Sequence, residues 1–148
     1  MAPVPIRTCC VDASVLIPYY TDECISEEVR KYLQCHWDEW YTTPFCFFEA
    51  LSCFKRKHKR TKNPISADQY REAGSTLIND IRGRFRDIPG IESFNDSDVL
   101  NEVLKLCDEY EELDFSDAFQ ILSVEGKDSA LWSGAKLVTA DRGLADAA

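Results

Sequence analysis

The chain has 148 residues, of which 45% are hydrophobic and 29% charged, and its formal net charge is −9. This size and composition predict one globular domain over residues 1–148 and leave little room for a long disordered tail. The acidic balance argues against a protein that coats nucleic acid by its overall charge. No stretch approaches the roughly 20 apolar residues of a membrane span, and the N-terminal residues lack an apolar signal region. We therefore expect a cytoplasmic protein without a membrane partner.

Strands and helices are expected to alternate from the N-terminus. The run TCCVDASVLI at Thr8–Ile17 is β-branched and apolar, which predicts a strand buried on both faces. Ser26 is the expected cap of a helix, and Trp40–Thr43 is expected to form a second short strand. Pro44 suits the first turn of the next helix. The apolar stripe of that helix consists of Phe47, Leu51 and Phe54.

The middle of the chain predicts two more helices. Ser66 and Gln69 have the spacing of a capping box, so a helix is expected to start there. A short strand is expected between Phe85 and Phe94, within a loop-like segment. After Asn95, apolar residues recur at helical spacing and predict another helix.

The last third of the chain completes the alternation. LDFSDAFQILSV reads as a capped helix from about Ser116, and AKLVTAD reads as a short strand that ends at Asp141. Parallel strands need crossover connections, which helices supply. The sequence therefore predicts an α/β fold with three layers, α/β/α, around a parallel sheet of about four to five strands.

Seven cysteines raise the question of a disulfide or zinc framework. Their number is odd, and no Cys-x-x-Cys pair occurs. Most of them lie among apolar residues, where a reduced cysteine behaves as a small hydrophobic side chain. We expect this core role for Cys9, Cys10, Cys46, Cys53 and Cys107.

Six of the 17 basic residues fall within eight positions of an otherwise acidic chain. Cations near a helix C-terminus complement the helix dipole, but six exceed what capping needs. Clustered Lys and Arg bind polyanions, so we interpret the cluster as an RNA-binding surface. Its members are Lys55, Arg56, Lys57, Lys59, Arg60 and Lys62.

Asp12 is the most informative acid, because it interrupts a run that reads as a buried strand. Carboxylates are almost never fully buried unless they are paired or bind a metal, and the nearest cation on this strand is Arg7. Asp141 ends its own strand, and ligands of open parallel sheets bind at the carboxyl ends of strands. Both acids are therefore expected to face one crevice.

Two further acids are ambiguous when each is taken alone. Asp117 opens a helix, where capping is as good an explanation as catalysis. Glu49 lies between aromatic residues on its helix and alone would be a surface acid. Together with Asp12 and Asp141 they predict a cluster that divalent cations would make tolerable, since several ionised carboxylates repel one another. Oxygen ligands favour Mg²⁺ or Mn²⁺.

Four motifs carry a resemblance that spans nearly the whole chain: VDASVLI, the helix acid in FFEALSCF, SDAFQI and LVTAD. Their order and element types resemble those of PIN-domain ribonucleases, including VapC-type toxins. The resemblance implies a PIN-like fold and an endoribonuclease that depends on Mg²⁺ or Mn²⁺. It implies that the catalytic, metal-binding acids are Asp12, Glu49, Asp117 and Asp141, with Ser14 and Thr139 as supporting hydroxyl residues.

The resemblance also implies partners. RNA would be the substrate, and toxin members pair as homodimers that a small antitoxin silences. Members of the family continue past the last motif into a helix and an edge strand, whereas this sequence ends at Ala148. We expect either a truncated edge or a sheet without that strand. Asp114 and Asp146 lie near the motif positions and are the neighbouring alternatives to Asp117 and Asp141.

Other functions stay open at this level. A PIN-like RNA-binding or docking module would keep the same acids, and a DNA-directed nuclease is not separated because no motif reads a 2′-hydroxyl. An aspartyl phosphatase would normally carry a second Asp two residues after Asp12, where this chain has Ser14. A receiver-like phosphoacceptor would need paired acids early in the chain, but Val11 precedes Asp12.

Overall fold

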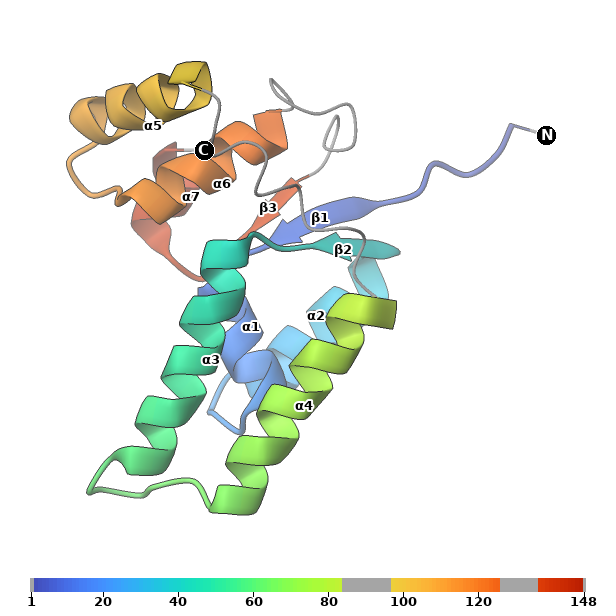
Figure 1. The fold of residues 1–148 in the computed structure, drawn as a ribbon. Coiled ribbons are helices and arrows are strands. Elements are labelled where there is room, and N and C mark those ends of the chain that lie inside the picture. The colour runs from blue at the N-terminus through green and yellow to red at the C-terminus, as the bar shows by residue number, and fades with distance from the viewer. Residues whose placement is uncertain (1, 84–96, 126–135, 148) are drawn as a thin grey trace.

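The computed structural model describes residues 2–83, 97–125 and 136–147 (Figure 1). Strands and helices alternate along these residues as the sequence predicts. The strands are β1 (Thr8–Val11), β2 (Glu39–Tyr41) and β3 (Lys136–Val138). The helices are α1 (Ala13–Tyr20), α2 (Ser26–His36), α3 (Pro44–Lys59), α4 (Ala67–Gly83), α5 (Ser97–Glu109), α6 (Phe115–Glu125) and α7 (Arg142–Ala147).

The three strands form one parallel sheet in the order β2-β1-β3. Cys9 lies opposite Trp40 on one side and Lys136 on the other, which fixes the register. The predicted α/β class with a parallel sheet is therefore confirmed. The described residues hold fewer strands than the four to five predicted, and the strand expected between Phe85 and Phe94 lies outside them.

The first predicted strand was too long. Thr8–Ile17 was expected to be one strand, but β1 ends at Val11 and α1 begins at Ala13. Asp12 makes the break, because its side chain accepts a hydrogen bond from the Ser14 N–H and so caps the helix. A short apolar run does not distinguish a buried strand from a buried helix, which is why the pattern failed here.

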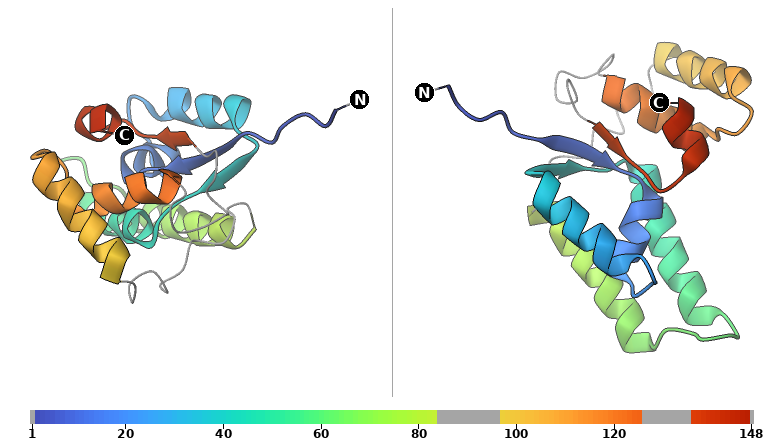
Figure 2. Two further views of the ribbon diagram at one scale, coloured as in Figure 1. Left: turned by 90° about the horizontal axis from the view of Figure 1, so that it is seen from above. Right: turned by 180° about the vertical axis from the view of Figure 1, so that it is seen from behind.

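Alternate residues of the strands pack into different clusters. Cys9 and Val11 of β1 pack with Leu33 of α2, whereas Cys10 packs with Tyr41 and with residues of α6 and β3. Viewed from above, α2 and α6 lie on opposite sides of the strands (Figure 2). Helices thus cover both faces of the sheet, and β1 is buried on both faces as predicted.

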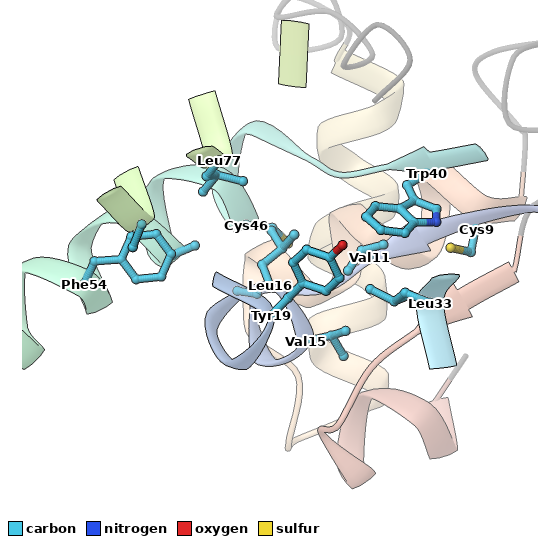
Figure 3. Close-up of a cluster of buried hydrophobic side chains, with 13 residues drawn as sticks. Cys9, Val11, Val15, Leu16, Tyr19, Leu33, Trp40, Cys46, Phe54 and Leu77 are labelled. Atoms are coloured by element: carbon cyan, nitrogen blue, oxygen red, sulfur yellow. The ribbon is translucent and has the colours of Figure 1, made fainter. Parts of the chain in front are cut away.

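The larger cluster lies between β1 and the helices α1 to α4. Figure 3 shows it, with Val11 and Tyr19 close to Cys46 of α3 and with Phe54 further along that helix. Phe54 is fully buried, so the middle of α3 is anchored in the core. The helix therefore leaves the carboxyl edge of the sheet in a fixed direction and ends at the turn that joins it to α4 (Figure 1).

Caps define the starts of the helices. Thr43 caps α3 by accepting a hydrogen bond from the Cys46 N–H, with Pro44 in the first turn. The capping box of Ser66 and Gln69 is confirmed at α4. The expected cap at Ser26 is wrong: this residue is the first of α2, and its hydroxyl donates to the Thr21 carbonyl instead.

All seven cysteines are free, in agreement with the prediction of reduced side chains. Cys9, Cys10 and Cys46 are buried, and Cys53 and Cys107 are partly buried. Burial raises the pKa of the Cys9 and Cys46 thiols to about 12, so both stay protonated at neutral pH. Within the described ranges, no helix combines the length and apolar character needed to cross a membrane.

Candidate functional site

Asp12 lies at the centre of the site, directly after β1. Its side chain is only 6% exposed, which confirms the expected burial of this acid. No Lys or Arg forms an ion pair with it in the parts of the chain that the structure describes. The nearest cation in sequence, Arg7, pairs with Asp38 instead, and this pairing lowers the pKa of the Asp38 carboxyl group. The Asp12 charge must therefore be stabilised by hydrogen bonds.

Donors from four segments supply those hydrogen bonds. Asp12 Oδ2 accepts from the Ser14 hydroxyl at 2.5 Å and the Thr139 hydroxyl at 2.9 Å. Asp12 Oδ1 accepts from Gln120 Nε2 at 2.9 Å and from the Cys46 thiol, whose sulfur lies 3.7 Å away. One carboxylate thus connects α1, α3, α6 and the residues that follow β3.

Ser14 and Thr139, the two predicted supporting residues, also organise the backbone. Their hydroxyl oxygens lie 3.2 Å apart. Ser14 Oγ accepts from the Ala140 N–H, and Thr139 Oγ1 accepts from the Asp141 N–H, each at 2.9 Å. These bonds hold the segment after β3 against the segment after β1, so Asp141 starts its helix beside Asp12.

Asp117 lies at the start of α6 in a reciprocal cap with Asp114. Asp114 accepts from the Asp117 N–H at 2.9 Å, and Asp117 accepts from the Asp114 N–H at 3.2 Å. Partial burial raises the Asp117 pKa to about 6, and the negative charges of Asp114, Asp12 and Asp141 add to the rise. The hydrogen bond from the Asp114 N–H lowers it in part. Three neighbouring acids therefore act on Asp117.

The other two predicted acids lie at the rim. Asp141 is exposed, and its Oδ1 caps α7 by accepting from the Leu144 N–H at 3.1 Å. Glu49 is exposed in the first half of α3. Desolvation raises the Glu49 pKa, the charges of Asp12 and Asp114 raise it further, and Arg56 lowers it. The four predicted acids thus occupy one region, at the carboxyl edge of the sheet.

Gln120 is a site residue that the sequence reasoning missed. It is fully buried, and its Nε2 donates to Asp12. Its Oε1 has no hydrogen-bond partner among the described residues, which is costly for a buried carbonyl oxygen. The sequence did offer a signal for Gln120: its polar amide lies between Phe119 and Ile121 on an otherwise apolar helix, one turn after Asp117.

The acids do not form a closed set of metal ligands in this arrangement. Across residues 2–83, 97–125 and 136–147, no three His, Cys, Asp or Glu side chains are grouped so that they could hold an ion. The hydrogen bonds explain this spacing, because Asp117 and Asp141 each use an oxygen to cap a helix. Ionised carboxylates also favour separation when no cation lies between them.

The predicted basic cluster lies at the far end of α3, and its members differ in how accessible they are to a ligand. Lys57 is largely buried, and its Nζ binds Glu23 and Thr21, so it is not free for a ligand. Arg60 donates to the Asn63 carbonyl at the turn after the helix. The exposed residues Lys55, Arg56, Lys59 and Lys62 remain as the accessible cations.

A groove of about 970 Å³ runs along β3. Val29 and Tyr32 of α2 and Trp37 just after it line the groove together with Val138 and Thr139. Its lining includes none of the four predicted acids, but Thr139, which donates to Asp12, belongs to both the groove and the acidic site.

Comparison with known proteins adds no assignment. No protein-family model matches the chain, and no curated protein matches it. The candidate site therefore depends on its own geometry.

Proposed function

We propose that this chain is a metal-dependent endoribonuclease of the PIN-domain type, with Asp12, Glu49, Asp117 and Asp141 as the acids that hold Mg²⁺ or Mn²⁺. One observation carries the proposal. Acids from four separate segments lie in one region at the carboxyl edge of a parallel sheet, where burial raises the pKa of Asp117 and of Glu49 and the charges of Asp12 and Asp114 raise both further. Such an arrangement costs free energy unless it serves a cation or a proton transfer.

The donor chemistry fits a hard divalent cation. The acidic side chains offer only oxygen atoms, and the uncompensated Oε1 of buried Gln120 adds a further oxygen acceptor beside Asp12. Asp12 is already held in position by four side-chain donors, whereas Asp117 and Asp141 each use an oxygen in a helix cap. We infer that these two carboxylates give up their caps when an ion is bound.

In this proposal, the residues of the site have different roles. Bound Mg²⁺ or Mn²⁺ would supply a water of lowered pKa and charge stabilisation for the leaving oxygen. Ser14 and Thr139 orient the Asp12 carboxylate through their hydrogen bonds. Asp117 loses its proton near pH 6, so the complete set of negative charges exists only above that pH.

A second candidate function is a PIN-like docking or RNA-binding module without catalysis. The helix caps favour it, because Asp117 and Asp141 already have structural roles that need no metal. A toxin that pairs as a homodimer and is silenced by an antitoxin is the biological role that the family resemblance suggests, and it stays a prediction. If the substrate is DNA instead of RNA, the same site would make the chain a DNA-directed nuclease.

Calorimetric titration with Mn²⁺, followed by incubation with a labelled structured RNA, separates the two candidates. We expect wild type to bind Mn²⁺ and cleave the RNA at internal positions. Asp12→Asn is expected to lose cleavage by at least about a hundredfold while keeping its circular-dichroism spectrum, since the amide keeps the acceptor oxygen but not the charge.

Asp68→Asn is the matched control, because the Asp68 side chain is 93% exposed on α4 and pairs only with Arg71 among the described residues. It should behave as wild type. Full cleavage by Asp12→Asn in the presence of Mn²⁺ would remove the proposal. Wild type that neither binds Mn²⁺ nor cuts RNA or DNA would favour the docking module.

A further inference from the structure

The solvent-facing side of α3 connects the acidic site with the basic cluster. Phe48 and Glu49 lie on it near the sheet, and Lys55, Arg56 and Lys59 lie on it further along, all of them exposed. Lys55 and Lys59 follow Phe48 at seven and eleven residues, a spacing that returns to one face of a helix. At a rise of about 1.5 Å per residue, Phe48 and Lys59 are separated by roughly 16 Å along the helix axis.

The cations at the far end are available to a ligand. Lys55, Arg56 and Lys59 form no ion pair within the described portion of the chain. The rest of the molecule is acidic, because the whole chain carries a net charge of −9. A polyanion is therefore attracted to this face and repelled by the remaining surface.

Exposed aromatic rings mark the other end. Phe48 is 63% exposed and Phe115 is 60% exposed, which makes them the most exposed aromatic side chains among the residues that the structure describes. Phe48 precedes Glu49, and Phe115 lies between Asp114 and Asp117 in sequence. Phe48 packs edge-on against Phe47, but most of each ring faces solvent, so their position next to the acids in sequence is better explained by a ligand with flat apolar faces.

We propose that the solvent-facing side of α3, together with Phe115 at the start of α6, binds an unpaired nucleic-acid strand, with bases stacked on Phe48 and Phe115 and phosphates on Lys55, Arg56 and Lys59. Unstacked bases are presented by single strands and loops, whereas a duplex hides them. At the 3.4 Å rise of a stacked strand, about 16 Å corresponds to roughly five nucleotides between the ring and the last cation. The position of the cut rests on the proposed nuclease function, but binding of the strand does not.

Fluorescence anisotropy in EDTA measures binding without cleavage. The probes are a labelled 12-nucleotide single-stranded RNA, a 12-base-pair duplex of the same sequence and a trinucleotide. We expect the single strand to bind more tightly than the duplex. Phe48→Ala should weaken single-strand binding by about 5- to 100-fold, and Phe48→Trp should retain it, because stacking needs only a flat ring. The matched control is Tyr32→Ala, which removes another exposed ring, on α2.

The cations are tested through the salt dependence of binding. Replacing Lys55 and Lys59 together by alanine should reduce the slope of log K against log salt by about 1.4 for the 12-nucleotide strand, and should not change trinucleotide binding. Exposed Lys31 and Lys105, on α2 and α5, give the control double variant.

Two results would overturn the inference: Phe48→Ala binding the single strand as wild type does, or the duplex binding as tightly as the single strand. Binding with the expected variant effects but without cleavage in Mn²⁺ would support this surface and contradict the nuclease proposal. Cleavage of RNA by wild type, together with Phe48→Ala binding the single strand as wild type does, would support the nuclease proposal and contradict this surface.

Discussion

Asp12 shows how a buried acid is kept without a counter-cation. Hydrogen bonds from two hydroxyl groups, an amide and a thiol replace the hydration of its charge. Removing one of these donors leaves a buried carboxylate oxygen with fewer hydrogen-bond partners, which costs free energy. The contribution of Gln120 is separable, because it alone reaches Asp12 from α6.

Replacing Gln120 by leucine should therefore lower the free energy of unfolding by about 1–3 kcal/mol. The apolar side chain keeps most of the volume but removes the donor to Asp12 Oδ1. Urea denaturation followed by circular dichroism measures the change. Gln34→Leu is the control, since Gln34 is exposed and donates to the Tyr19 hydroxyl at 3.3 Å. Equal stability of Gln120→Leu and wild type would mean that the amide does not stabilise Asp12.

At the scale of elements, the start of α6 places two acids next to each other and next to the site. The reciprocal cap fixes Asp114 and Asp117 at the N-terminus of the helix, where the helix dipole favours negative charge. Burial and the neighbouring acids oppose that effect and raise the Asp117 pKa. The balance leaves the Asp117 carboxyl group with a pKa of about 6.

The contribution of Asp117 to the stability of the fold should therefore fall as the pH rises from about 4 to 6. The folded Asp117 pKa of about 6 exceeds the ordinary value of 3.8, so the native state binds more protons than the unfolded state in this interval. Because Asp117 is only partly buried, solvent screening reduces the loss attributable to it to about 1–2 kcal/mol, measured by urea denaturation across the interval.

Asp117→Asn tests the assignment, because the amide keeps an acceptor for the Asp114 N–H and cannot ionise. Its stability should depend less steeply on pH than that of wild type, whereas the control Asp68→Asn should follow wild type. Parallel curves for Asp117→Asn and wild type would show that other groups cause the pH dependence.

Sequence patterns predicted most elements because their signals are local. The capping box at Ser66 and the apolar stripe of α3 depend on residues within a few positions of one another, and both are found. The division of Thr8–Ile17 into a strand and a helix was missed because an apolar run has no period that separates the two. A single hydrogen bond, from the Ser14 N–H to Asp12, decides it.

The site was predictable only in part, because some of its contacts join residues that are far apart in the sequence. Asp12, Ser14 and Thr139 were identified from motifs, and the structure joins them by hydrogen bonds. Gln120 was not identified, because its importance comes from a contact with Asp12 across 108 positions of the chain. The capping role of Asp141 was equally hidden, since it depends on a backbone N–H group of the folded helix, whereas capping was one of the two roles that the sequence left open for Asp117.

At the scale of the whole molecule, negative charge is concentrated where the helices meet the carboxyl edge of the sheet. The net charge of −9 adds a general repulsion to the local one among the site acids. Any divalent cation held there relieves both at once. Folding and metal binding are therefore expected to be coupled, because the unfolded chain disperses the same acids.

Mn²⁺ should accordingly raise the midpoint of thermal unfolding. At a concentration of one hundred times Kd, binding to the native state alone contributes about 2.7 kcal/mol, which corresponds to roughly 5–10 °C for a chain of this size. Differential scanning calorimetry at constant ionic strength measures the shift, with NaCl in place of MnCl₂ as the control for screening. Asp117→Asn should reduce the shift, because it removes one charged ligand but preserves the helix cap. The same shift in NaCl, or in Asp117→Asn, would show that Mn²⁺ acts by screening the surface and not by binding to these acids.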